Sequence, residues 1–180
     1  MVKHTRIVYD DWKLIVKMYF LLLDKSEAVF EVIIPLVIAV SCTVIYTKFG
    51  LVAKALIHLS AIMPSIASIL IGFTVMLITI LLTSGSESVK KLKDRKSKRQ
   101  LFGNRISLFQ LLHIQFCYLL IVEVFLLLYI LAYLFLSGIG VPRLIQNISL
   151  VVICFLTTSI LLCIVRSISN LHFGFFNSEL

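Results

Sequence analysis

The sequence has few charged residues. Of its 180 residues, 14% are charged and 60% are hydrophobic, and the mean hydropathy is +1.06. A soluble domain is about a quarter charged and roughly half apolar. The composition therefore excludes an ordinary soluble domain and indicates a membrane protein. Because each membrane crossing uses about 20 residues, four or five crossings leave no room for a separate catalytic domain.

The sequence also lacks the motifs of catalysis and of metal binding. It contains no GxSxG, HExxH, P-loop or dinucleotide-binding pattern, and its apolar runs hold no paired carboxylates or clustered histidines. The cysteines lie in apolar runs without a CxxC pair, which is typical of small buried hydrophobic residues: Cys42, Cys117, Cys154 and Cys163. We therefore expect a protein that is not an enzyme and that binds no cofactor and no metal.

Four apolar runs are long enough to cross a bilayer. We expect these membrane spans at residues 28–47, 56–83, 107–137 and 147–166. The second and third exceed the hydrocarbon core at 1.5 Å per residue, so they must tilt, kink or emerge on one side. The predicted fold class is all-α, a polytopic membrane protein with four transmembrane helices.

The first 27 residues, 1–27, contain a segment of a different kind. Lys13 and Lys17 share one helical face, and Trp12 with several aliphatic residues occupies the other. This pattern predicts an amphipathic helix that lies in the membrane interface, where Trp12, Lys13 and Lys17 would act as the anchor. The alternative is a soluble helix that packs on a partner protein.

Basic residues set the expected orientation. With four spans, 14 of the 17 Lys and Arg residues lie on one side of the membrane, and Lys48, Lys54 and Arg143 lie on the other. The positive-inside rule then places both termini of this multi-pass protein in the cytoplasm.

The excess charge is concentrated between the second and third spans. Residues 84–106 form a predicted cytoplasmic loop with seven candidate residues for binding lipid or a partner: Lys90, Lys91, Lys93, Arg95, Lys96, Lys98 and Arg99. Three interpretations stay open, namely a topology signal that touches lipid headgroups, a docking site for an acidic protein, and weak nucleic-acid contact. Without interleaved aromatic residues we expect no sequence-specific nucleic-acid binding.

Polar residues inside the spans are the other candidates. Glu123 lies near the middle of the third span, where an ionised carboxylate costs about 3 kcal/mol. Thr157 and Thr158 of the fourth span offer hydroxyl groups at a comparable depth. Glu123 is then either a neutral acid hydrogen-bonded between helices or a protonatable latch or pore-lining group.

Two further features concern packing. Small or helix-bending residues recur every four positions in the second span, at Ser60, Pro64, Ser68 and Gly72, and predict close helix packing in the bundle or between copies. Residues 167–180 form a predicted cytoplasmic tail rich in Phe, which favours an interfacial anchor.

The span pattern, the basic central loop, the ILIGF run at 69–73 and the SNLHFGFF tail resemble small membrane components of bacterial antiphage defence systems, in particular the membrane subunit of Kiwa. This resemblance implies a homo-oligomer such as a tetramer. It also implies that the protein senses disturbance of the inner membrane and holds a cytoplasmic partner that binds DNA. The alternative function is a small pore-forming or ion-conducting membrane effector.

Overall fold

The computed structural model describes residues 11–138 and 140–176, and the following account concerns these residues. The expected N-terminal segment 1–27 and the expected tail 167–180 therefore lie partly outside the described residues.

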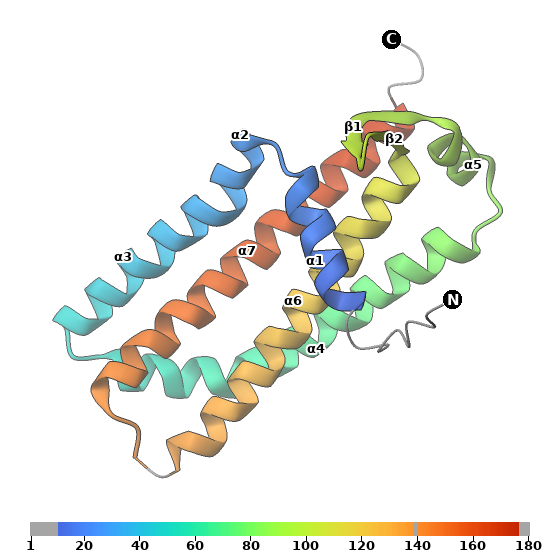
Figure 1. Ribbon diagram of the computed structural model, residues 1–180. Coiled ribbons are helices and arrows are strands. Elements are labelled where there is room, and N and C mark those ends of the chain that lie inside the picture. Colours follow the sequence, from blue (N-terminus) through green and yellow to red (C-terminus); the bar gives the residue numbers. More distant parts are fainter. Residues whose placement is uncertain (1–10, 139, 177–180) are drawn as a thin grey trace, which may run out of the picture.

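Four long helices form the body of the protein (Figure 1). The first is continuous from Lys25 to Lys48 and consists of α2 (Lys25–Ala28), a π-helical turn (Val29–Ile33) and α3 (Ile34–Lys48). The others are α4 (Val52–Thr83), α6 (Leu108–Ser137) and α7 (Arg143–Phe176). All four are long and apolar enough to cross a membrane, which confirms an all-α, multi-pass membrane protein.

The fourth helix is longer than its apolar core. We expected a span at 147–166, followed by a tail, but α7 begins at Arg143 and continues to Phe176. The apolar run identifies only the part suited to hydrocarbon, whereas backbone hydrogen bonds extend the helix through polar residues at either end. Residues 167–176 are thus helical.

The helices α6 and α7 are the central pair of the bundle. On the far side of α7 lies α3, and α4 packs chiefly against α6 (Figure 1). The buried positions of α4 recur mostly at seven-residue spacing, at Ser60, Ala67, Thr74 and Leu81, which is the spacing of a narrow helix-packing seam. Many large apolar side chains on the outer helix faces are exposed, as expected of a surface that lipid covers.

The basic segment between α4 and α6 is folded. It forms α5 (Glu87–Asp94) and a β-hairpin of β1 (Lys96–Leu101) and β2 (Asn104–Ser107). Leu92 of α5 and Ile106 of β2 are buried in the main apolar core. We expected a loop because charge dominates the composition of this segment, but its few apolar residues attach it to the bundle.

Two local features hold the hairpin in place. Its turn consists of Phe102 and Gly103, which both have positive φ, +51° and +83°, as a two-residue type I′ hairpin requires. At its other end, Ser107 Oγ accepts a hydrogen bond from the Gln110 amide at 3.2 Å, and Gln110 Oε1 accepts one from the Ser107 amide at 3.0 Å. This capping box starts α6 directly from the second strand.

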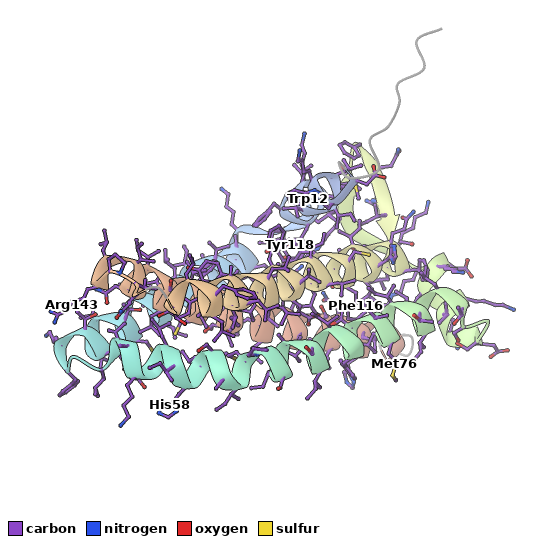
Figure 2. The ribbon with its side chains drawn as sticks, turned by 90° about the horizontal axis from the view of Figure 1, so that it is seen from below. Trp12, His58, Met76, Phe116, Tyr118 and Arg143 are labelled. Carbon is purple, nitrogen blue, oxygen red and sulfur yellow. The ribbon has the colours of Figure 1, made fainter. Side chains whose placement is uncertain are left out.

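The amphipathic helix is present as α1 (Asp11–Leu22) and lies against α6. The ring of Trp12 lies 5.8 Å from that of Phe125, and Tyr19 stacks on Tyr118 with centroids 3.6 Å apart. Trp12 and Tyr19 are seven residues apart, and their partners Phe125 and Tyr118 are seven residues apart in the reverse order, so α1 packs on α6 in the opposite chain direction. Figure 2 shows Trp12 and Tyr118 on the same side of the bundle. Part of the apolar side that we expected to face lipid therefore contacts protein, whereas Lys13 and Lys17 are exposed.

Candidate functional site

A network of buried and partly buried charges lies at the end of the bundle that carries the hairpin, which we call the hairpin end. Its members are Glu27 and Glu31 of the first span, Arg99 of the hairpin and Arg166 of α7. We call these four residues the charged network. They join three segments that are distant in sequence: the first span, the hairpin and the last span.

The first span supplies both carboxylates from an irregular stretch of helix. Pro35 has no backbone N–H, so the usual α-helical hydrogen bond to the Glu31 carbonyl cannot form. The π-helical turn Val29–Ile33 immediately precedes the proline, and the Glu31 carbonyl accepts a hydrogen bond from Ser159 Oγ of α7 at 3.3 Å. Such π-helical turns occur frequently at functional sites.

Arg166 is the central cation of the network. Its Nη1 donates to Glu31 Oε1 at 2.7 Å and lies 3.7 Å from Glu27 Oε2. The side chain of Arg166 is 13% exposed, and that of Glu31 is 7% exposed. When the Gln115 amide is oriented with its oxygen toward Arg166, this oxygen accepts from Nη2 at 2.6 Å and from Nε at 3.0 Å. In this orientation all three nitrogen atoms of the Arg166 guanidinium group donate hydrogen bonds.

Arg99 brings the hairpin into the network. Its guanidinium group pairs with Glu27, donates to the Leu22 carbonyl and lies 3.7 Å from Asp24 Oδ2. The Glu27 carboxylate also accepts the Asp24 amide at 3.1 Å. The side chain of Arg99 is only 16% exposed. The sequence places Arg99 among the candidates for binding lipid or a partner. Its guanidinium group is already paired with Glu27 and lies near Asp24, and contact with lipid or a partner stays a prediction.

Tyr19 connects α1 to the same network. Its hydroxyl donates to the Glu31 carboxylate and lies 3.6 Å from Cys163 Sγ, and the Arg166 guanidinium carbon is 5.3 Å from the ring centroid. Burial is the largest of the causes that raise the pKa of Tyr19 above its ordinary value, and Cys163 and Glu31 raise it further. The hydroxyl is therefore protonated at physiological pH and serves as a donor.

Glu123 occupies a separate position in the middle of α6. It is fully buried, and its Oε1 accepts a hydrogen bond from Thr74 Oγ1 of α4 at 3.0 Å. Among the described residues, nothing hydrogen-bonds its Oε2. The donor is thus Thr74, which we had not considered, whereas Thr157 and Thr158 donate to carbonyl oxygens of their own helix. Because the carboxyl group is enclosed within one chain, it does not reach the surface that a pore-lining ring would need.

The predicted basic residues fall into two groups. Lys90 and Lys91 are exposed on α5, on the side away from buried Val89 and Leu92. Lys93 is also exposed, but it is one turn from Val89, and its Nζ lies 4.9 Å from the centroid of the Phe109 ring of α6. Arg95 follows α5, and Lys96, Lys98 and Arg99 belong to β1. The structure therefore divides these cations between a helix and the hairpin that follows it.

The row of small residues on α4 does not follow the packed face of that helix. Ser60 is buried and Pro64 is half-buried, but Ser68 and Gly72 are exposed. A Cβ atom added at Gly72 would meet nothing within 4 Å. Within one chain, α4 is a peripheral helix and not the centre of the bundle, which we had considered as one explanation of the row.

Sequence reasoning missed the charged network because we treated its members separately. Glu31 lies near the start of the first span, and Arg166 is one of the 14 basic residues expected on the cytoplasmic side. The signal was present: the first span begins, and the fourth ends, at the same side of the membrane, so acids and a cation occur there at similar depth. Opposite charges in apolar helices that meet at one depth are expected to pair.

The network can hold segments together, and it contains no arrangement suited to metal coordination. Within the described ranges, no three His, Cys, Asp or Glu side chains are placed to share a metal ion. No protein-family model, curated protein or solved structure matches the chain. Any proposal for the function must therefore start from the contacts and burial of the described residues.

Proposed function

We propose that the chain is a non-enzymatic, homo-oligomeric subunit of the inner membrane, with both termini in the cytoplasm. It senses disturbance of the membrane and anchors a cytoplasmic protein partner, in antiphage defence. The defence role, the tetrameric state and a partner that binds DNA come from the resemblance to the Kiwa membrane subunit. The sensing and anchoring roles have physical support in the charged network.

The observation that carries the proposal is the position of Glu27. This residue contacts Arg99 of the hairpin and lies 3.7 Å from Arg166 of α7. One carboxylate therefore links a membrane span, a second membrane span and the basic segment. Helices that exceed the hydrocarbon thickness respond to a change in bilayer thickness by tilting. A change of tilt between the first and last spans would alter the contacts of Glu27 and so move the hairpin.

The exposed face of α5 is the proposed contact with the partner. Lys90, Lys91 and Lys93 project from it, and Phe102 at the hairpin turn is 71% exposed. An aromatic residue is typical of the core of a protein interface, and a row of cations favours an acidic partner by steering and register. This combination supports docking of an acidic protein.

The outward row on α4 supports association between copies. Ser68 and Gly72 leave space at the surface of the helix, and small residues permit the backbones of two membrane helices to approach closely. We propose that α4 contributes to the contact between subunits.

Co-purification tests the anchoring role. The tagged chain would be isolated from cross-linked cells as the wild type and with Lys90, Lys91 and Lys93 changed to Glu. The matched control changes Lys48, Lys54 and Arg143, at the opposite end, to Glu. We expect the α5 variant to lose a protein that the wild type and the control retain. Equal recovery of the same proteins with all three chains would contradict the proposal, as would ion flux through the purified wild type in liposomes.

A further inference from the structure

A cavity at the hairpin end borders the charged network at Arg99. It has a volume of about 700 Å³ and lies between β1, the end of α1, the start of α6 and the end of α7. The cations on its wall are Arg95, Lys96 and Arg99, and Ser97 and Gln100 add polar groups. Leu21, Leu108 and Leu111 add apolar side chains to the lining. The cavity therefore offers both cationic and aliphatic side chains to a ligand.

We propose that this cavity binds the headgroup of an anionic glycerophospholipid of the cytoplasmic leaflet. The phosphate would lie against Arg95, Lys96 and the Ser97 hydroxyl, because cations and hydroxyl groups complement phosphate oxygens. The first part of an acyl chain would lie against Leu21 and Leu111. Leu21 is 55% exposed directly beside these cations, which suits a ligand that is itself charged at one end and apolar at the other.

The charge balance of the wall favours an anion. Three cations and one acid, Asp24, line the cavity. Asp24 is at the margin, with a side chain that is 72% exposed, and it lies 3.7 Å from Arg99 Nη2. A bound phosphate would compete with Asp24 for Arg99, whereas Glu27 holds the same guanidinium from the side of the bundle. Lipid binding would therefore act on the residue that connects the hairpin to the spans.

The location favours a membrane lipid over free phosphate. The cavity is lined by the first residues of α6 and by Asn170 near the end of α7, both of them membrane spans. Acyl chains of the adjacent leaflet are thus within reach of its apolar wall. This inference does not depend on the proposed function, because a lipid site at this place would exist whether or not the protein anchors a partner.

Native mass spectrometry of the full chain tests the site. The protein would be released from nanodiscs that contain equal amounts of phosphatidylglycerol and phosphatidylcholine with the same acyl chains. We expect the wild type to retain phosphatidylglycerol preferentially. The substitution Lys96→Gln should lower that preference by about fivefold, which corresponds to one cation at an anionic surface. The matched control, Arg105→Gln at an exposed position of β2 that does not line the cavity, removes the same charge and should leave the preference unchanged.

Two further measurements distinguish a lipid from other anions, and a defined binding site from non-specific electrostatic attraction of the lipid. Leu21→Asn removes part of the apolar wall and should also reduce lipid retention, although it changes no charge. Inorganic phosphate in large excess should fail to displace the lipid. The inference is overturned if the wild type retains both lipids equally, or if Arg105→Gln and Lys96→Gln have equal effects. It is also overturned if Leu21→Asn has no effect, or if inorganic phosphate displaces the phosphatidylglycerol.

Discussion

The pair between Arg166 and Glu31 gives the sharpest prediction for stability. Arg166→Met keeps the length and apolar character of the side chain but leaves the Glu31 carboxylate without its cation. Breaking a buried ion pair costs about 3–5 kcal/mol in soluble proteins, and a lone charge at the centre of a membrane helix costs about 3 kcal/mol. Glu31 is six residues from the start of its span, about 9 Å from the end, and Tyr19 still donates to it. We therefore expect a loss of about 2–3 kcal/mol in the free energy of unfolding.

The assay is unfolding of the purified protein by SDS in mixed micelles, followed by a double-mutant cycle. Glu31→Gln alone should cost less than Arg166→Met, because Arg166 retains Gln115 and the nearby Glu27. The double variant should lose less than the sum of the two single losses, by about 1–2 kcal/mol. Arg105→Met, at an exposed position of β2, is the control and should change stability by less than about 0.5 kcal/mol. Strict additivity, or equal losses for Arg166→Met and Arg105→Met, would refute the ion pair as a stabilising contact.

Four other substitutions test three separate parts of the structure. Glu123→Gln keeps an oxygen for Thr74, so it should change the free energy of unfolding by less than about 1 kcal/mol. Thr74→Val should lower the free energy of unfolding by about 0.6–1.7 kcal/mol. A larger loss for Glu123→Gln than for Thr74→Val would show that the charge itself is required. Leu92→Ala removes a fully buried side chain of α5 and should lower the free energy of unfolding by about 2–5 kcal/mol. Trypsin should then cleave the basic segment faster than in the wild type. Equal cleavage rates would mean that this segment is not folded on the bundle. Gly103→Ala forces a Cβ atom into a backbone with φ +83° and should cost about 1 kcal/mol, with faster cleavage in the hairpin but no change in oligomeric state.

The long spans could be predicted from the sequence because hydropathy alone determines which segments can be buried in lipid. No soluble alternative exists for runs such as 107–137, and the observed helix α6 (Leu108–Ser137) follows that prediction closely. The ends of α7 could not be predicted in the same way. Its last turns contain polar residues that backbone hydrogen bonds can hold in a helix outside the apolar core.

The basic segment shows a different limit. Its many Lys and Arg residues indicate a solvated loop, and only a few apolar residues determine its fold. Leu92 and Ile106 attach it to the bundle, and Gly103 permits the tight turn of the hairpin. These contacts are made with α6 and other distant elements, so periodicity within the segment could not reveal them.

The pairing of charged residues depends on which helices are neighbours. The sequence places Glu123 in mid-span, but only the packing of α4 on α6 brings Thr74 to it. Likewise, Glu31 and Arg166 are 135 positions apart and meet because α3 packs on α7. Residue types and depth could be predicted, whereas the partners required the order of the helices in space.

The distance between the hairpin and the opposite end of the bundle tests whether the charged network transmits the state of the membrane to the basic segment. Spin labels at Arg105 and Lys54, both exposed, would report this distance by pulsed electron paramagnetic resonance in bilayers with short and with long acyl chains. We predict that this distance changes with bilayer thickness in the wild type. We also predict that the change is clearly smaller in Glu27→Gln, which weakens the link between Arg99 and Arg166. An unchanged distance in the wild type, or the same change in both proteins, would contradict a mechanism in which the charged network transmits the state of the membrane to the basic segment.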